Sequence, residues 1–294
     1  MSNCSIPYIS INPAYICTYN RPEYNRSRTL KERNNERNLA NNNNNGKVSK
    51  KARKRMEKAI NWMLYEAKEK LLYPNSNKIR FKFKIAFVTL TLSSSQSHTD
   101  NYIKKNLLQP FLDKARKKWN VNNYVWRAER QKNGRIHFHI ILDQYIHWNE
   151  LRNEWNKIQA KNGYMNEFRE KFGHKNPNST DIHSVYKIKN IARYLAKYIT
   201  KEEKNKKVEG RLWGLSYSLS CLKNASEMID SKISAELEKI WSKFKSKVVK
   251  RDYVEICYVG IKEWFELDLK LLKRVMDEYL SACRQLKPAC LQMT

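Results

Sequence analysis

Residues 124–142 read YVWRAERQKNGRIHFHIIL, and this stretch determines how we interpret the chain. It predicts two strands, 124–130 and 135–142, joined across the turn signal Asn133-Gly134. Alternation in the second strand places His137 and His139 on one face and Phe138 on the other. Two adjacent imidazoles form a two-nitrogen chelate. The stretch therefore predicts a divalent-metal site, with a pair of structural histidines as the alternative.

The register of this hairpin follows from the numbering of its apolar residues. Both strands carry their apolar set at even positions: Tyr124, Trp126 and Ala128 in the first, and Ile136, Phe138, Ile140 and Leu142 in the second. Opposite residues share a face, so paired numbers must sum to an even value and the loop must have an odd number of residues. This register places Glu129 on the histidine face, opposite or diagonal to His137.

A carboxylate beside two imidazoles, with open coordination positions, suits Mg²⁺ or Mn²⁺ acting on a phosphate group. Glu129 is therefore the expected third ligand after His137 and His139. The alternative for Glu129 is an ordinary salt bridge with Arg127 or Arg130.

A second pattern lies at residues 194–201, which read YLAKYITK in a predicted helix over about 188–203. Tyr194 and Tyr198 are four residues apart and therefore neighbours on one helix face, and each is followed three residues later by a lysine, Lys197 or Lys201. Such tyrosines are usually packing residues. A phenolate can nevertheless attack a DNA phosphodiester and conserve its bond energy as a phosphotyrosine, with nearby ammonium groups stabilising the charge.

The charge of the chain points to a polyanionic partner. Its 58 Lys and Arg residues against 29 Asp and Glu residues give +29, and each phosphate contact made by a cation releases a condensed counterion. A ribosomal-type or merely basic protein is the alternative, while an anionic membrane surface lacks the apolar run that it would need. None of the six cysteines is spaced as CxxC, which is typical of free thiols. We find no signal peptide or transmembrane stretch, which predicts a cytoplasmic protein.

Further elements give an α+β pattern with largely antiparallel strands. Residues 1–45 read as irregular and end in an asparagine run, and 47–73 read as a helix with a basic first half that binds phosphates or is simply solvated. Strands are expected at 85–92, 182–186, 211–221 and 252–259, and helices at 99–119, 148–161, 225–248 and 261–286. Asp181 and His183 share a strand face and are candidates for touching DNA, or ordinary surface residues.

Three of these motifs together resemble a known family. The strand Phe87–Leu92, the His-hydrophobe-His strand and the Tyr-x-x-Lys-Tyr-x-x-Lys helix follow the order of the three motifs of HUH endonucleases. The doubled tyrosine is most similar to the two-tyrosine rolling-circle replication initiators of microviruses, the small isometric single-stranded DNA phages. The glutamate eight residues before His137 also resembles the third metal ligand of related initiators. The similarity covers residues 85–203.

The resemblance implies a central antiparallel sheet of about five strands with flanking helices. It implies His137, His139 and Glu129 as ligands of Mg²⁺ or Mn²⁺, Tyr194 and Tyr198 as nucleophiles, and Lys197 and Lys201 as accessory groups. The expected organisation is a basic N-terminal extension over 1–80, a nuclease domain over 81–205 and a C-terminal α/β extension over 206–294.

The implied activity is metal-dependent, origin-specific nicking and rejoining of single-stranded or supercoiled DNA through a 5′-phosphotyrosine, in the cytoplasm of a bacterial host. Without a GxxxxGK[ST] loop, strand opening would need a host helicase, and synthesis a host polymerase. Two alternatives remain open: a plasmid or transposon nuclease of the same chemistry, and a non-catalytic single-stranded DNA-binding protein.

Overall fold

The computed structural model describes residues 5–22, 48–67, 70–72, 81–184, 208–222, 224–251 and 254–291. Its best-predicted feature is the hairpin of β6 (Tyr124–Arg130) and β7 (Ile136–Leu142). The connecting loop has five residues, 131–135, and Gly134 adopts a φ of 87°, which favours glycine. Glu129 pairs directly with His137, so the odd loop and the expected register are both confirmed.

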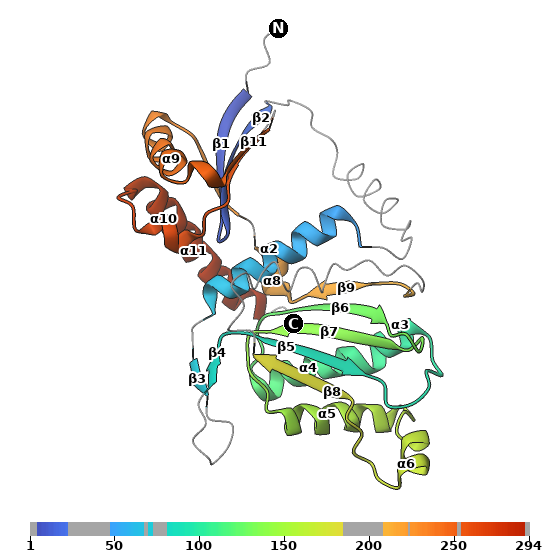
Figure 1. Ribbon diagram of the computed structural model, residues 1–294. Helices are drawn as coiled ribbons and strands as arrows, with labels where there is room; N and C mark the ends of the chain where they lie inside the picture. The colour runs from blue at the N-terminus through green and yellow to red at the C-terminus, as the bar shows by residue number, and fades with distance from the viewer. Residues whose placement is uncertain are drawn as a thin grey trace. The chain divides into compact units, whose positions relative to one another are not determined.

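This hairpin forms part of a five-stranded antiparallel sheet (Figure 1). The strand order is β8-β5-β7-β6-β9, with β5 at Ala86–Thr91, β8 at Thr180–Ser184 and β9 at Trp213–Leu215. The helical run comprises α3 (Asp100–Ile103), the π-helical turn η1 (Lys104–Leu108) and α4 (Gln109–Trp119), as expected for 99–119. Helix α5 (Trp148–Lys161) has its predicted bounds, and α6 (Asn166–Phe172) follows it. The α+β class and the five-stranded antiparallel sheet are confirmed.

The two faces of this sheet have different roles. Helices α4 and α5 pack against the face that carries Phe138, and the buried aromatic rings of Phe111 and Trp155 meet edge to face at 5.9 Å. The other face carries the histidines, and α2 (Lys50–Glu66) lies on that side (Figure 1). The guanidinium of Arg55 in α2 is 5.9 Å from the ring of Trp213, whose strand position is opposite Arg127. The apolar core thus leaves one sheet face available for polar chemistry.

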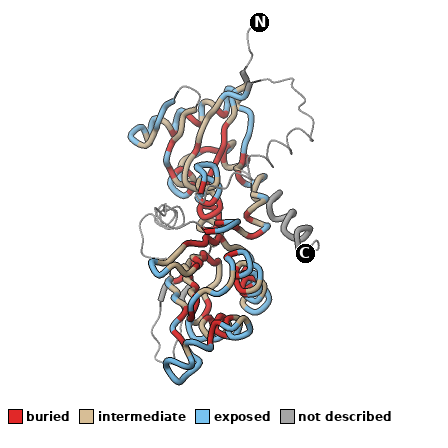
Figure 2. The backbone as a smooth tube through the Cα atoms, turned by 90° about the vertical axis from the view of Figure 1, so that its right-hand side faces the viewer, coloured by how far each residue is buried: buried red, intermediate tan, exposed pale blue. Residues whose placement is uncertain are grey.

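A second five-stranded antiparallel sheet has the order β10-β1-β2-β12-β11. Its strands come from both ends of the chain: β1 (Ser5–Asn12) and β2 (Tyr15–Pro22), then β10 (Ala225–Met228), β11 (Val248–Arg251) and β12 (Val254–Cys257). Helices α9 (Ser231–Lys243), α10 (Ile261–Phe265) and α11 (Lys270–Leu291) lie on one side of it (Figure 1). Their core includes Ile9, Ile11 and Ile16, which have no exposed surface (Figure 2).

The chain accordingly divides into two compact units. One combines Met1–Ala40 with Cys221–Thr294, and the other is the continuous stretch Asn41–Ser220. The continuous unit also contains β3 (Lys70–Leu72) and β4 (Phe81–Phe83), which pair only with each other among the described strands, and α8 (Tyr217–Cys221) lies at its end. Strands from both expected extensions, 1–80 and 206–294, share one sheet.

Several sequence expectations outside the central region are wrong. Residues 5–22 form a hairpin, whereas we expected irregular chain. Isoleucines alternate along β1, and the turn after it is closed by Asn12, whose side-chain oxygen accepts from Ala14 N at 3.1 Å. The expected helix over 225–248 begins only at Ser231, because Asp230 caps it through Ile233 N at 2.7 Å, and β10 precedes it.

Smaller corrections concern element ends. The helix expected to reach residue 73 ends at Glu66, and the strand expected over 211–221 stops at Leu215 before α8. The strand expected over 252–259 is shorter and pairs with a further strand, β11, while the single helix expected over 261–286 is divided into α10 and α11.

Candidate metal centre

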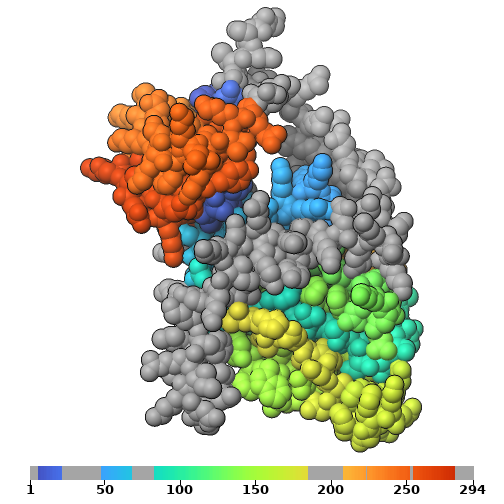
Figure 3. All heavy atoms as spheres, viewed as in Figure 1, coloured from blue at the N-terminus to red at the C-terminus, as the bar shows by residue number. Residues whose placement is uncertain are grey.

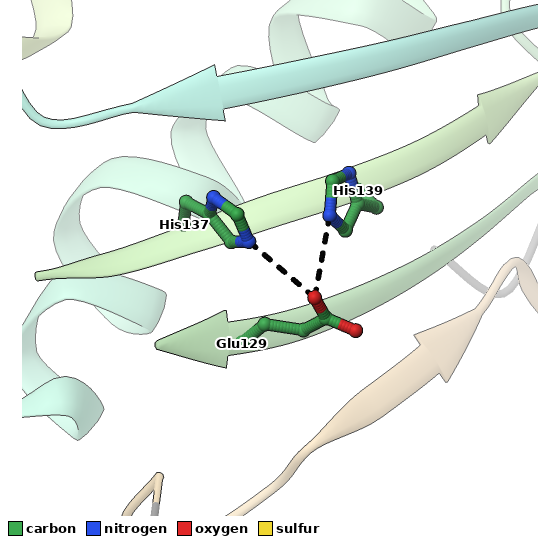
Figure 4. A group of neighbouring side chains, drawn as sticks. All are labelled: Glu129, His137 and His139. Carbon is green, nitrogen blue, oxygen red and sulfur yellow. Dashed lines mark hydrogen bonds and ion pairs between the residues drawn. The ribbon is translucent and has the colours of Figure 1, made fainter. Parts of the chain in front are cut away.

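Glu129, His137 and His139 meet on the face of the sheet opposite α4 and α5 (Figure 4). Glu129 Oε2 lies 3.5 Å from Nε2 of His137 and 3.4 Å from Nε2 of His139. The β6–β7 register produces this meeting directly, because Glu129 is opposite His137 and His139 is two residues further along the same face. The three residues predicted as metal ligands are therefore together.

The spacing of these atoms fits a bound cation. Ligand atoms about 2.1 Å from an ion are about 3.0 Å apart at right angles and about 3.4 Å apart at tetrahedral angles. The three side chains keep between 12% and 15% of their surface exposed, so they are held in place yet accessible from one side. A carboxylate and two imidazoles could hold a divalent ion and leave coordination positions for phosphate oxygens and water.

The electrostatic environment keeps the Glu129 carboxylate ionised. Burial opposes its charge, but hydrogen bonds from His137 and His139 and the nearby Arg127 guanidinium lower the pKa of Glu129 to about 2. Arg127 Nε lies 3.3 Å from Glu129 Oε1, the oxygen that does not face the histidines. Of the two arginines considered as partners for Glu129, Arg127 is the one that pairs with it. Arg130 instead pairs with the buried Asp100 at 2.7 Å.

The ring of His139 is oriented by strand β5. Thr89 Oγ1 lies 3.2 Å from His139 Nδ1, and the ring of Phe87 stacks on the imidazole at 5.3 Å between centroids. Thr89 is directly opposite His139 in the β5–β7 ladder. When Nε2 acts as the ligand atom, Nδ1 carries the proton and donates it to the Thr89 hydroxyl, an arrangement typical of metal-bound histidines.

His137 differs, because its Nδ1 is buried and has no hydrogen-bond partner among the described residues. Its ring meets that of His139 at 4.6 Å between centroids, at an interplanar angle of 65°. Its Nε2, facing Glu129, is the atom placed to share a ligand with the other two residues.

The remaining predicted site residues are placed as follows. Tyr194, Lys197, Tyr198 and Lys201 lie outside the described residues. Asp181 and His183 are exposed on edge strand β8, which lies at the surface in Figure 3, and their side chains form a 2.7 Å ion pair. Asp181 is opposite Thr89 and His183 is opposite Phe87, so both are on the same sheet face as the histidines.

Cations flank this face. Lys50, Lys51, Lys54 and Arg55 on α2 are exposed, and Arg55 approaches Trp213 on the histidine side of the sheet. The sequence pattern allows these cations to be either phosphate-binding or solvated. The position of α2 brings the first possibility into line with the candidate metal centre.

Two residues of the site were missed from the sequence. Arg127 shares the odd-numbered face of β6 with Glu129, so the same parity argument would have found it. Thr89 required knowledge of the β5–β7 register, for which the sequence carries no comparable signal.

Comparison with known proteins links this region to replication. Residues 85–203 match the family model of the replication-associated protein known as ORF2 or gene 2 protein. No curated protein and no solved structure matches the chain. None of the helices within the described residues has the length and apolar character needed to cross a bilayer. The matched residues include the whole candidate metal centre.

Proposed function

We propose that the chain is a rolling-circle replication initiator that nicks and rejoins single-stranded DNA with a metal ion and a tyrosine nucleophile. The observation that carries this proposal is the Glu129–His137–His139 cluster, lying inside the stretch that matches a replication-associated family. The HUH-like order of motifs and the doubled Tyr-x-x-Lys unit support it further. The nuclease domain is proposed to comprise residues 81–205.

Glu129, His137 and His139 would hold the ion, Mg²⁺ or Mn²⁺. When bound, it would supply Lewis-acid polarisation of the scissile phosphate and an orienting template. Arg127 keeps Glu129 ionised and Thr89 fixes the His139 ring, so the ligand set is organised before DNA arrives. Arg127 also adds a fixed positive charge where the phosphate becomes more negative.

In the proposed reaction, the phenolic oxygen of Tyr194 or Tyr198 attacks the phosphorus at the origin. A tyrosine O–P bond forms as the P–O3′ bond breaks, so the 5′ end becomes a phosphotyrosine ester. The phenol loses its proton and the departing 3′ oxygen gains one, which leaves a free 3′-hydroxyl for a polymerase. No water is consumed, and the phosphodiester bond energy is conserved for rejoining.

Two tyrosines would allow the cycle to close. After one round of synthesis, the second tyrosine attacks the regenerated origin, and the 3′-hydroxyl so released attacks the first phosphotyrosine to seal a circle. Lys197 and Lys201 would give each phenol a similar electrostatic setting. Such a cycle needs a host helicase to open the duplex and a host polymerase to extend the strand, in the cytoplasm of a bacterium infected by a microvirus-like phage.

The test is incubation of the full chain with circular single-stranded DNA carrying the cognate origin, with Mn²⁺ or Mg²⁺ and separately with a chelator. We expect metal-dependent linear product covalently joined to the protein, and phosphotyrosine only in the peptide containing residues 194–198. DNA binding with no covalent product under any metal condition would instead favour a non-catalytic single-stranded DNA-binding protein.

A further inference from the structure

The sheet built from the two chain ends has one face without a described helix over it. Its helix-covered face carries Ile11, Ile16 and Glu255, and Glu255 accepts from Trp241 of α9 at 2.8 Å. The β-strand parity places the alternate residues on the opposite face. Among the described residues of this unit, α9, α10 and α11 all lie on the first side (Figure 1). The opposite face is therefore available to a partner.

Four tyrosines dominate this opposite face. Tyr8 and Tyr19 are directly opposite each other on β1 and β2, and their rings stack at 6.1 Å with an interplanar angle of 23°. Tyr15 and Tyr258 form a second pair at 6.3 Å, tilted by 60°. Because Tyr15 and Tyr19 are four residues apart on β2, the two pairs are about 13 Å apart along the strands. We call these four residues the tyrosine face.

The tyrosine face is half-open to solvent. Tyr8, Tyr15 and Tyr19 are half-buried, while Tyr258 is 54% exposed and Met228, opposite Tyr8, is 51% exposed. A solvated set of stacked and tilted aromatic rings on a flat sheet is an unusual use of apolar surface in a chain this polar, and such patches mark interaction sites.

Charge beside the tyrosine face has one sign. Arg21 places its guanidinium 5.4 Å from the Tyr8 ring centroid, and Arg251 ends the strand row that contains Tyr8 and Tyr19. Within the described strands of this sheet, the acidic residues are Glu227 and Glu255, and both lie on the helix-covered face. The electrostatic setting of the tyrosines therefore favours an anionic ligand.

We propose that the tyrosine face is a second binding surface for single-stranded DNA, in which unpaired bases stack on the tyrosines and the flanking arginines contact phosphates. Every base offers a π-face, so stacking on exposed aromatics is sequence-tolerant and suits single strands. Duplex DNA hides those faces, and an acidic peptide would have no use for the aromatic rings. The tyrosine face and the candidate metal centre belong to different sheets, so binding at the first does not require nicking at the second.

The test measures binding of the full chain to a fluorescent oligonucleotide of about 15 deoxythymidines by anisotropy, with chelator present so that cleavage is irrelevant. We expect the double variant Tyr8→Leu/Tyr19→Leu to bind about tenfold more weakly or worse, because leucine keeps bulk but removes the stacking surface. The slope of log affinity against log salt should not change, since the cations that neutralise phosphates all remain.

Matched variants separate stacking from folding. Tyr8→Phe/Tyr19→Phe keeps both rings and should retain nearly full affinity. Phe265→Leu removes an aromatic ring from α10, on the helix-covered side, and should also leave the affinity unchanged. Equal weakening by the leucine and phenylalanine variants, or by Phe265→Leu, would overturn the proposal.

Photocrosslinking of the unaltered chain provides a test without mutation. An oligonucleotide containing 5-iododeoxyuridine should crosslink to peptides from 5–22 and 254–258 in addition to the nuclease domain. Crosslinks confined to residues 81–205 would refute a second DNA surface. So would leucine variants that bind DNA normally but change the sedimenting mass, because that result would identify the tyrosine face as a contact between protein copies.

Discussion

The two sheets of this protein have the same number of strands and the same antiparallel pairing, yet they are assembled differently. The sheet with the candidate metal centre draws all its strands from one continuous stretch, Ala86 to Leu215. The other sheet joins β1 and β2 to strands more than two hundred residues later. A face built from nearby segments can be predicted by local periodicity, whereas a face built from distant ones depends on pairings that no local pattern records.

The open faces of the two sheets differ in chemistry as well. The metal-bearing face gathers one carboxylate and two imidazoles whose atoms lie at ligand spacing. The tyrosine face has rings, hydroxyls and neighbouring arginines, and its described residues include no cluster suited to a metal ion. The difference suggests that the reaction takes place on one sheet and that the strand is retained on the other. Variants on each sheet can break or sharpen this separation.

The largest effect is expected at the metal centre. His137→Ala or His139→Ala should abolish nicking of an origin oligonucleotide, while affinity for single-stranded DNA stays largely intact, because cations and stacking supply it. His174→Ala, which changes an exposed histidine of a loop, is the matched control. Undiminished nicking by the His137→Ala/His139→Ala double variant in chelator would remove the metal assignment.

Next in size is the effect of the tyrosine pair. Tyr194→Phe and Tyr198→Phe should each still nick an oligonucleotide once, whereas the double variant should form no covalent product. Each single variant should fail to release repeated unit-length circles in a replicating system. If one single variant loses all nicking and the other cycles normally, the two tyrosines do not alternate.

A matched pair of core substitutions tests the independence of the two sheets. Ile11 and Ile140 are both fully buried, one in each sheet. Replacement by alanine should cost about 2 to 5 kcal/mol in either case. Hydrogen exchange followed by mass spectrometry should show Ile11→Ala accelerating exchange in β12 but not in β6 or β7, and Ile140→Ala doing the reverse. Uniform acceleration in both units would mean that they unfold together.

A smaller effect is expected from Thr89, the partner of His139. Thr89→Val removes the hydroxyl near His139 Nδ1 and should weaken Mn²⁺ binding about 10- to 100-fold, as measured by the metal dependence of nicking and by direct titration. Thr89→Ser restores the hydroxyl and should recover the affinity. Equal Mn²⁺ affinity in the valine and serine variants would show that this contact does not position the ring.

The smallest effect on the reaction itself should come from the basic helix α2. Neutralising Lys50, Lys51, Arg53, Lys54 and Arg55 together should weaken DNA binding and flatten its salt dependence by about 0.7 in slope for each phosphate that is no longer neutralised. Nicking of short substrates at saturation should be unchanged. An unaltered salt slope would return these residues to a solvated helix face.

The candidate centre was largely predictable because one strand pair contains it. The even-numbered apolar residues of 124–142 were enough to fix the β6–β7 register and to bring Glu129 to His137. Thr89 could not be found in the same way, because it reaches His139 from a strand whose register depends on packing across the sheet. The tyrosine helix was recognisable from its spacing, but it lies outside the described residues.

The terminal unit was predicted poorly for a related physical reason. The N-terminal residues 5–22 carry alternating isoleucines and a turn-forming Asn-Pro, but two strands alone are only marginally stable, and their partners are encoded at 225–257. The short β10 was hidden next to a longer helical pattern that begins only after the Asp230 cap.

The nesting of one unit inside the other has a consequence for biosynthesis. Asn41–Ser220 is complete in sequence before any of β10, β11 or β12 has left the ribosome, so the metal-bearing sheet can form while the first hairpin is still without its neighbours. The earliest residues to emerge are therefore among the last to find their sheet. A growing chain would acquire its candidate nuclease centre before its tyrosine face, and the unpaired edges of β1 and β2 would need protection throughout translation of the segment between them.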